Sequence, residues 1–395
     1  MSKEVWILSA ARTPVGSFNG ALASVPAPTL GATAIKAAVE RAGIAPADVD
    51  EVIMGCVLPA ALGQAPARQA SIHAGLPPAT GAMTINKVCG SGLKAVGLAA
   101  QAIIAGDAKV VAAGGMESMS GAPHALKGSR DGFRMGDAKL LDLMVYDGLW
   151  DAYNNCHMGN FADKTATEKS VTREELDAFA TDSYKRAQAA QAAGKFKDEI
   201  VPVEVPGRKG AVTVVDEDEE PGRVMFEKIP SLKPAFNKDG VVTAANASSI
   251  NDGGAAMVVA DAEWAKAKGL KPLARVVAQA TASKEPQWFT LAPIDAINRV
   301  LEKAGLTKDD IDLWEINQAF SVVSVATQKE LGLDPAKIDV NGGAVAIGHP
   351  IGASGARILT TLLYAMKDRG ARYGLATLCI GGGEAFAMIF ERIDG

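Results

Sequence analysis

The chain has 395 residues, of which 48% are hydrophobic, and this is enough for two domains that each bury a core. It carries 40 Lys and Arg against 45 Asp and Glu, so its net charge of −5 argues against a nucleic-acid footprint or a polybasic membrane anchor. The four cysteines form no CxxC pair and have no metal-ligand spacing, which argues against a disulfide framework or a zinc site.

The N-terminal segment runs directly into a strand predicted over residues 5–10. It lacks the basic and apolar pattern of a signal peptide and the Arg- and Ser-rich pattern of a transit peptide. No uninterrupted apolar run looks long enough to span a membrane. We therefore expect a cytoplasmic protein with no membrane partner, and a processed mitochondrial form stays open.

Strands and helices alternate in the first third of the chain. Apolar runs predict strands over residues 49–57 and 110–113, and helical patterns cover residues 30–42, 68–74 and 93–105. This alternation predicts an α/β fold whose sheet is covered by helices on both faces.

Cys89 lies in the stretch Asn-Lys-Val-Cys-Gly-Ser-Gly, between a β-prone run at residues 83–85 and the helix predicted from residue 93. This arrangement predicts a sharp strand-to-helix turn, which Gly90 and Gly92 permit. The N–H groups at a helix N-terminus favour a thiolate, so Cys89 is a candidate nucleophile. On this stretch alone, a small buried cysteine in a packing turn is an equally good interpretation.

The composition changes after about residue 120. Residues 121–249 show no clear strand periodicity and resemble a long insertion, with one amphipathic helix predicted over residues 174–193. The acidic run at residues 216–222 is most simply a solvated loop.

From about residue 271 the first pattern returns. Residues 41–50 resemble residues 303–312, and residues 89–92 resemble residues 352–355 at nearly the same offset. We interpret this as an internal duplication. It predicts an N-terminal half of residues 1–120 and 250–270, an inserted domain of residues 121–249, and a C-terminal half of residues 271–395.

The two predicted halves differ at the positions that carry chemistry. The second half has Gly352 where the first has Cys89, but it offers His349 just upstream and Cys379 before three glycines. If the halves face each other, Cys89, His349 and Cys379 meet in one central cleft, where catalytic groups concentrate.

Six stretches together resemble the thiolase family, in particular its short-chain acetoacetyl-CoA thiolases, the acetyl-CoA acetyltransferases. They are NKVCGSG at 86–92, GGMESMS at 114–120, HMG at 157–159, TAANAS at 243–248, NGGAVAIGHPIGASGAR at 341–357 and CIGGG at 379–383. The resemblance is closest to the potassium-dependent mitochondrial type, through residues 183–184, 218–228, 288–293 and 314–317.

The resemblance implies a duplicated α/β sandwich, layered α-β-α-β-α, with a loop domain inserted for coenzyme A binding and oligomer contacts. It also implies a homotetramer built as a dimer of dimers. No covalent cofactor is implied, but a potassium ion is, near Tyr184, Ala244, Ala245, Ala247 and Val345.

The implied reaction is the reversible Claisen condensation of two acetyl-CoA to acetoacetyl-CoA and CoA through an acetyl-Cys89 intermediate. His349 would take the thiol proton, and Cys379 would move the proton of the second acetyl-CoA. The N–H groups of Cys89 and Gly381 would form one oxyanion hole, and His349 with a water on Asn317 the other. For His349 the alternative is a structural histidine in a turn.

The same resemblance implies the residues that bind the acyl-CoA. They are Tyr184, Arg223, Lys228, Ser248, His157, Met158, Ala319, Phe320 and Phe289. Core packing is the alternative for Met158 and Phe289, and neutralisation of the acidic run is the alternative for Arg223 and Lys228. Phe289 would wall the acyl pocket and accompany acceptance of 2-methylacetoacetyl-CoA.

The sequence departs from the family pattern at Gln318, where Glu is usual, and at Glu384, which is an unusual residue after the glycines. Three other functions stay open: a longer-chain degradative 3-ketoacyl-CoA thiolase, an irreversible condensing synthase, and a non-catalytic acyl-CoA binding subunit. The joint presence of Cys89, His349, Asn317 and Cys379 argues against the last of these.

Overall fold

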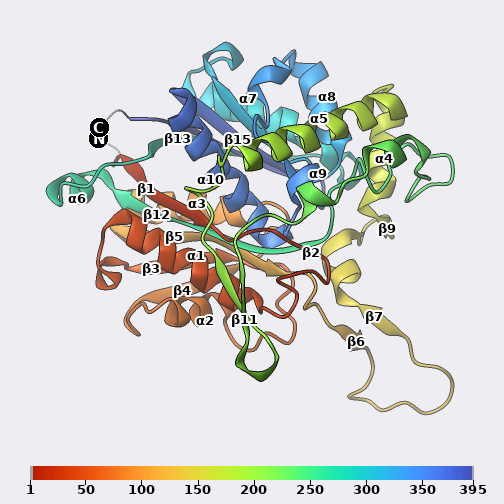
Figure 1. The fold of residues 1–395 in the computed structure, drawn as a ribbon, viewed down its shortest axis with the longest axis horizontal. Helices are drawn as coiled ribbons and strands as arrows, with labels where there is room; N and C mark the ends of the chain where they lie inside the picture. The colour runs from red at the N-terminus through yellow and green to blue at the C-terminus, as the bar shows by residue number, and fades with distance from the viewer. Residues whose placement is uncertain (1–2, 394–395) are drawn as a thin grey trace.

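A ten-stranded mixed sheet forms the frame of the protein, as seen in a computed structural model that describes residues 3–393 (Figure 1). Its strands follow the order β14-β15-β16-β13-β1-β12-β5-β3-β4, and the short β2 pairs with β12. Their bounds are β1 Val5–Arg12, β2 Gly16–Ser17, β3 Glu51–Gly55, β4 Gly81–Ile85, β5 Val110–Ser118, β12 Asn251–Asp261, β13 Ala274–Ser283, β14 Leu313–Ile316, β15 Tyr373–Ile380 and β16 Glu384–Glu391.

The strand order repeats itself about the middle of the sheet. On one side lie β1, β12, β5 and β3, and on the other β13, β16, β15 and β14, with the same parallel and antiparallel pairings. β1 and β13 pair antiparallel at the junction, where Trp6 faces Arg275. The duplication seen in the sequence therefore has a counterpart in the topology, with β4 as an additional edge strand.

Helices lie outside each half of the sheet, and two more lie between the two halves, which gives the expected α-β-α-β-α layers. α1 (Ala27–Ala42) and α2 (Pro66–His73) lie outside the first half, and α7 (Ala292–Ala304) and α8 (Ser321–Leu331) outside the second (Figure 1). α3 (Ser91–Ala105) and α10 (Ile351–Arg369) pack against each other in the central layer. The remaining α-helices of the second half and its junction are α6 (Ala262–Ala267) and α9 (Ala344–Ile347).

Small residues let the two central helices approach closely. A Cβ on Gly92 would lie 2.7 Å from the Ala356 nitrogen, and one on Gly355 would lie 2.3 Å from the Leu93 nitrogen. Both contacts are shorter than van der Waals separation, so a larger residue at either position would push α3 and α10 apart. Cys89 and His349 lie two residues before the first residues of α3 and α10, so this packing also fixes the distance between the two turns that carry them.

Side chains alternate between the central layer and the outer layers along each strand. In β1, Ile7 packs into the central core, whereas Trp6 and Leu8 pack under α1. In β16, Phe386 points to the central core and Ala387 to the outer one. Strands buried on both faces have continuous apolar runs, and such a run predicted β1 from the sequence, whereas β16 was not predicted.

The insertion is built from short elements and two longer helices. Its elements are β6 His124–Leu126, β7 Leu140–Asp142, a π-helix at Met144–Leu149, β8 Trp150–Asp151, β9 Cys156–His157, α4 Met158–Glu168, α5 Arg173–Ala192, β10 Val203–Pro206 and β11 Val212–Val215, followed by 3-10 turns at Glu220–Arg223 and Phe226–Ser231. The helix predicted over 174–193 corresponds to α5. The bounds of the three predicted parts stay a prediction, and residues 1–2 and 394–395 of those parts lie outside the described residues.

The acidic run at residues 216–222 is only in part the solvated loop that the sequence predicted, since Asp216 and Glu217 are exposed. Asp218 is buried, and its two oxygens accept hydrogen bonds from the Arg12 guanidinium at 2.7 and 2.9 Å. Arg12 also donates to Glu199 at 2.6 Å. The prediction was wrong for Asp218 because its partner Arg12 lies in β1, far away in the chain, and local composition gives no sign of it.

One apolar stretch, Val88–Ala105, has the length and composition of a membrane span, contrary to our reading of the sequence. It covers α3, and 56% of it is buried inside the protein. α3 lies in the central layer between the two halves, and core helices of this kind pass the same test of length and composition.

Candidate active site

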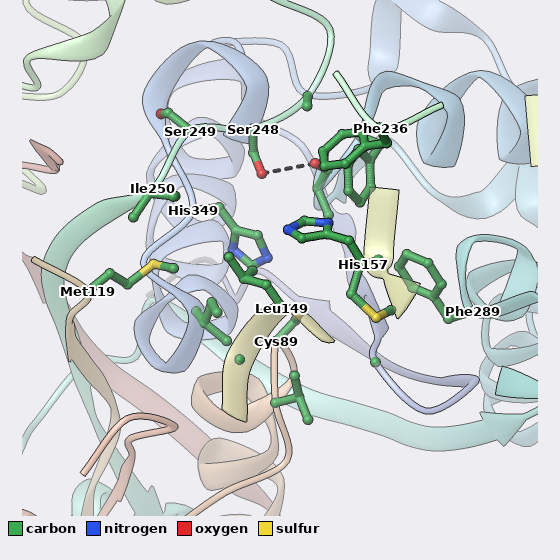
Figure 2. A pocket seen from close by; sticks show the side chains of 18 residues that line it. Cys89, Met119, Leu149, His157, Phe236, Ser248, Ser249, Ile250, Phe289 and His349 are labelled. Atoms are coloured by element: carbon green, nitrogen blue, oxygen red, sulfur yellow. Dashed lines mark hydrogen bonds between the residues drawn. The ribbon is translucent and has the colours of Figure 1, made fainter. Parts of the chain in front are cut away.

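A cavity of about 240 Å³ opens where the two halves and the insertion meet (Figure 2). Its wall combines the turn before α3, the loop before α10, the turn after β15 and segments of the insertion. The lining residues are Val88, Cys89, Met119, Gly148, Leu149, His157, Met158, Phe236, Ala247, Ser248, Ser249, Ile250, Phe289, Ala319, Phe320, His349, Ile351 and Gly381. The wall is mostly apolar with a few polar groups, which is typical of a site for a small organic ligand.

Cys89 lies on a tightly held turn directly before α3. Val88 adopts the left-handed conformation with φ of 47°, which is strained for a β-branched residue. Ser91 holds the turn, since its hydroxyl accepts from the Lys87 N–H at 2.8 Å and donates to the Val88 carbonyl at 2.7 Å. The strand-to-helix turn predicted from the sequence is therefore present, and it exposes the thiol to the cavity.

The acidity of Cys89 differs from the expectation. Burial raises the pKa of the thiol to about 11, although the backbone N–H groups of Gly381 and of Cys89 itself act in the opposite direction. The helix N-terminus therefore does not produce a resting thiolate in the empty site. Cys89 is a thiol at neutral pH, and it needs a base to become a nucleophile.

His349 is the base that the cavity offers. Its Nδ1 lies 2.5 Å from the Ser354 hydroxyl, which itself donates to the Pro350 carbonyl at 2.8 Å. Ser354 must then accept from an Nδ1–H, so the lone pair of the imidazole is on Nε2. Burial and the charge of Arg357 lower the pKa of His349 to about 3, so the ring is neutral and able to accept a proton at neutral pH.

Asn317 lies behind His349 and is almost fully buried. Its Nδ2 lies 3.5 Å from the His349 Nε2. Its Oδ1 is buried and has no hydrogen-bond partner among residues 3–393. A buried acceptor of this kind requires a donor, and a water or a substrate group in the cavity would supply it.

Cys379 is close to Cys89. Contrary to our expectation, it does not line the cavity. It ends β15 and is fully buried, whereas Gly381, two residues later, does line the cavity. Burial and the negative charge that Cys89 can carry raise the pKa of Cys379 well above its usual value. The two sulfurs are therefore close enough for the charge of one to affect the pKa of the other. Cys379 lies behind the cavity wall and is protonated at rest.

The glycines after Cys379 shape the turn that carries Gly381. Gly382 and Gly383 have φ of 90° and 91°, a conformation that other residues adopt only with strain. The turn directs the Gly381 N–H at the Cys89 sulfur, beside the N–H of Cys89. Two N–H groups that converge on one point next to a nucleophile are the components of an oxyanion hole.

An ion pair joins this turn to the turn of the nucleophile, and it accounts for the unusual Glu384. The Lys87 ammonium donates to Glu384, and the Ser283 hydroxyl lies 3.4 Å from the same carboxylate. Lys87 lies two residues before Cys89, and Glu384 lies three residues after Gly381. The departure from the family pattern thus removes no catalytic group and adds a contact between the two halves.

Six of the predicted acyl-CoA contacts line the cavity: His157, Met158, Ser248, Phe289, Ala319 and Phe320. The imidazoles of His157 and His349 both point into the cavity (Figure 2). His157 accepts from the Gly159 N–H at 3.1 Å through Nδ1, which leaves its Nε2–H for the cavity. Ser248 donates its hydroxyl to the Ala319 carbonyl at 2.9 Å, and this bond links the insertion to the second half.

Sequence reasoning missed Phe236, which stacks on His157 at 4.7 Å between ring centroids and contacts Phe320 edge-on. It also missed Met119, Leu149 and Ile250, which line the opposite wall. Phe236 belongs to a segment of the insertion without periodicity, so no local signal distinguishes it from other loop residues.

A second, more open hollow of about 370 Å³ continues the cavity toward the surface. The two share the residues Phe236, Ala247, Ser248, Ser249 and Ile250, and the outer one is also lined by Arg223. Arg223 and Lys228 are exposed, and neither forms an ion pair within the described part of the chain. The alternative that they neutralise the acidic run loses support, because Asp218 pairs with Arg12 instead. Lys228 does not line either hollow.

Two of the residues expected around potassium lie in the same part of the structure. Tyr184 and Val345 lie in one buried apolar cluster, outside the main cavity. Ala245 and Ala247 are buried, whereas Ala244 is exposed. Burial and the nearby Glu220 raise the pKa of Tyr184 to about 12, so its phenol is neutral. Potassium binding stays a prediction.

Comparison with known proteins gives a consistent result over the whole chain. Residues 5–263 match the model of the thiolase N-terminal domain, and residues 270–392 match that of the thiolase C-terminal domain. The chain is 58% identical over 390 residues to an acetyl-CoA acetyltransferase of Cupriavidus necator, covering 98% of this chain and 99% of the relative. It is 54% identical over 389 residues to an acetyl-CoA acetyltransferase of Yarrowia lipolytica, covering 98% and 96%.

Two solved structures are also similar. The crystal structure of the Bacillus anthracis acetyl-CoA acetyltransferase superimposes with a TM-score of 0.97 at 41% identity and covers 99% of both chains. The Acat5 thiolase from Ascaris suum, solved in complex with coenzyme A, superimposes with a TM-score of 0.94 at 46% identity and covers 99% of this chain and 100% of that one.

Proposed function

Because the chain belongs to the thiolase family, we propose that it is an acetyl-CoA C-acetyltransferase, which interconverts two acetyl-CoA with acetoacetyl-CoA and CoA. The observation that carries the proposal is the cavity in which Cys89, His349 and the Gly381 turn meet, reached through a hollow with Arg223 in its wall. The relatives of the same name match nearly the whole chain, and a structural relative binds coenzyme A.

Acetyl transfer to the enzyme is the first half of this chemistry. His349 Nε2 takes the proton of the Cys89 thiol while the sulfur attacks the thioester carbonyl. The raised pKa of Cys89 and the lowered pKa of His349 both oppose a separated ion pair, so proton transfer and attack occur together. The N–H groups of Cys89 and Gly381 stabilise the negative oxygen, the bond to the sulfur of CoA breaks, and His349 returns the proton to that sulfur.

Carbon–carbon bond cleavage in the reverse direction uses the same groups. Cys89 attacks the keto carbon of acetoacetyl-CoA, the bond to the adjacent carbon breaks, and acetyl-Cys89 and an acetyl-CoA enolate form. Cys379 supplies the proton that this enolate carbon needs, and its raised pKa keeps it protonated and ready for that step. His349 then passes the proton it took from Cys89 to the Cys379 thiolate, which restores that thiol. In condensation the same transfers run in reverse: Cys379 gives its proton to His349, takes a proton from the methyl group, and His349 returns its proton to Cys89 when the new carbon–carbon bond has formed.

The decisive experiment is a coupled assay of acetoacetyl-CoA cleavage in the presence of CoA, with 3-ketoacyl-CoA substrates of increasing chain length for comparison. We expect the C4 substrate to be cleaved with the highest kcat/KM. The aromatic side chains Phe289, Phe320 and Phe236 that close the cavity restrict its length. Preference for long chains would indicate the degradative alternative, and absence of cleavage with every substrate would indicate a non-catalytic acyl-CoA binding subunit.

Replacement of Arg223 with Ala is expected to weaken coenzyme A binding without affecting the chemical steps. Arg223 is exposed in the wall of the outer hollow and has no ion-pair partner within residues 3–393, so it is free to meet the phosphates of the nucleotide. Loss of one such contact should raise the KM for CoA about 10-fold, with kcat changed less than about twofold. The effect should shrink at high ionic strength.

Arg208→Ala is the matched control, because Arg208 is another exposed arginine of the insertion, at the turn between β10 and β11. Its KM should equal that of the wild type. An equal rise in both variants, or a fall in kcat alone for Arg223→Ala, would contradict the assignment of Arg223 and direct attention to Lys228.

Potassium activation and acceptance of a 2-methyl branch are finer parts of the proposal. The match of residues 183–184, 218–228 and 288–293 to the potassium-dependent type supports them, and so does the neutral, buried Tyr184. Thiolysis of acetoacetyl-CoA and 2-methylacetoacetyl-CoA should be faster with KCl than with NaCl at equal ionic strength. Equal rates in the two salts would remove potassium from the proposal, and lack of cleavage of the branched substrate would remove the second part.

A homotetramer and a cytoplasmic location complete the proposal. The hairpin of β6 and β7 projects far from the body of the protein (Figure 1) and carries the exposed apolar residues Phe133, Met135 and Leu140. Exposed apolar side chains on a projecting arm support an interface between copies. The location rests on the sequence alone, with a processed mitochondrial form as the alternative.

A further inference from the structure

Gln318 occupies a position next to the active site at which the family usually has a glutamate. It follows Asn317 directly and is almost fully buried. The residue at this position is therefore a neutral amide where the family usually has a negative charge. The contacts of Gln318 show which neighbouring group carries a charge instead.

The hydrogen bonds around Gln318 fix the orientation of its amide. The Ser183 hydroxyl accepts from the Gly343 N–H at 3.0 Å, so its proton goes to the Gln318 Oε1, 2.7 Å away. The Gln318 Nε2 then donates to the Asp339 Oδ2 at 2.7 Å. The carboxylate of this site is therefore that of Asp339.

Asp339 connects this amide to the backbone around Asn317. Its Oδ1 accepts from the Ile316 N–H at 2.9 Å, and its Oδ2 accepts from Gln318. The residues on both sides of Asn317 are thus held by one carboxylate. Asp339 is itself buried, with a left-handed φ of 44°, at the start of the loop that leads to His349.

We propose that Gln318 and Asp339 form an exchanged amide–carboxylate pair, which replaces the glutamate usual at this position and holds Asn317 beside His349 for the proposed thiolase reaction. The pair retains one negative charge, and both polar atoms of the Gln318 amide and both oxygens of Asp339 have a hydrogen-bond partner. Asp339 is a positioning residue in this arrangement, since it contacts the backbone next to Asn317 and does not line the cavity.

The hydrogen-bond geometry predicts opposite results for single and double exchanges. Gln318→Glu alone sets two carboxylate oxygens at a hydrogen-bond distance without a proton between them. Asp339→Asn alone leaves one acceptor oxygen for two donors and turns an NH₂ group toward another donor. In the double variant, the new carboxylate at position 318 accepts from Ser183 and from the new amide at position 339. The oxygen of that amide accepts from the Ile316 N–H, so all bonds are restored.

The charges around the pair decide how the Gln318→Glu variant responds to pH. Glu315 is a buried acid that faces Asp339, and Arg357 and Arg186 are the cations near it. Burial raises the pKa of Asp339 to about 6 even with the Gln318 donor present. A second carboxylate should raise it further, so the single variant should regain activity as the pH falls and a proton enters between the two acids.

The test measures kcat, KM, pH profile and thermal unfolding for Gln318→Glu, Asp339→Asn and the double variant. We expect each single variant to lose kcat by about 10- to 100-fold, the factor for one unsatisfied buried group, with KM changed less than about threefold. The double variant should recover kcat to within about threefold of wild type and should recover thermal stability. A double variant no better than the worse single variant, or single variants with wild-type kcat, would overturn the proposal.

The measurements of thermal stability and of kcat distinguish a failure of this proposal from a failure of the proposed thiolase function. Recovery of stability in the double variant shows the exchange even if the wild type cleaves no acetoacetyl-CoA, in which case only the thiolase function fails. Recovery of stability with kcat unaffected in all variants overturns the positioning role. If a single variant does not accumulate as folded protein, an active double variant still supports the pair, and a double variant that also fails to fold contradicts it.

Discussion

Replacement of Cys89 with Ala is expected to lower the rate of acetoacetyl-CoA cleavage by about 10⁴-fold or more, because Cys89 carries the acetyl intermediate and no other thiol lines the described cavity. Cys89 lines the cavity and receives the N–H groups of Gly381 and of its own backbone. Intact-protein mass spectrometry after mixing with acetyl-CoA should show one added acetyl group on the wild type and none on the variant.

Cys156→Ala is the control, since Cys156 is a partly buried thiol in β9 that does not line the cavity. Its rate and its acetylation should match those of the wild type. Equal cleavage rates for wild type and Cys89→Ala would remove Cys89 as the nucleophile, and acetylation that disappears in the Cys156 variant would move the assignment to that residue.

Replacement of Cys379 with Ala is expected to stop turnover after the first half of the reaction. Acetyl transfer from acetyl-CoA to Cys89 needs His349 but not Cys379, so the acetyl-enzyme should form. Condensation and cleavage both need a proton moved at the carbon of the second acetyl-CoA, and loss of that group should lower kcat by about 10²- to 10⁴-fold. Steady-state thiolysis and mass spectrometry on the same sample measure the two halves separately.

The Cys89→Ala variant provides the comparison, because it should fail in both measurements. A Cys379→Ala variant that turns over within a few-fold of wild type would show that another group moves the proton. Failure to acetylate would show instead that the buried Cys379 mainly supports the nucleophile turn. Either result would contradict the proton-transfer role of Cys379. The test matters because Cys379 is buried and does not line the cavity.

The layers of the fold were predictable because they depend on local patterns. Buried strands such as β5 and β16 are apolar along their length, and α1 and α10 end at Gly43 and Gly370 in the left-handed conformation that glycine permits. The repeat of these patterns predicted an internal duplication, and the strand order of the sheet shows a matching repeat. The position of a strand within the sheet was not predictable in this way. β4 is partly exposed because it is an edge strand with a neighbour on one side only, and its own residues do not indicate this.

The sequence also indicated which residues lie at the site, but it did not indicate their pKa values. Of the three residues expected to meet in one cleft, Cys89 and His349 line the cavity, whereas Cys379 is fully buried and does not line it. The pKa of Cys89 was expected to be low from its place at a helix N-terminus, but burial by residues of both halves raises it to about 11. Desolvation depends on everything that surrounds a group, and most of what surrounds Cys89 is distant in the chain.

The amino-acid sequence by itself determined the order of strands and helices, the duplication, and which residue types stand at the turns between them. These features arise from periodicity and turn chemistry over a few residues. Only the tertiary structure decided that Asp218 is the buried partner of Arg12, that Phe236 stacks on His157, and that Asp339 supplies the charge missing at Gln318. Each of these contacts joins residues from separate segments, and their pairing depends on how the folded layers bring those segments together.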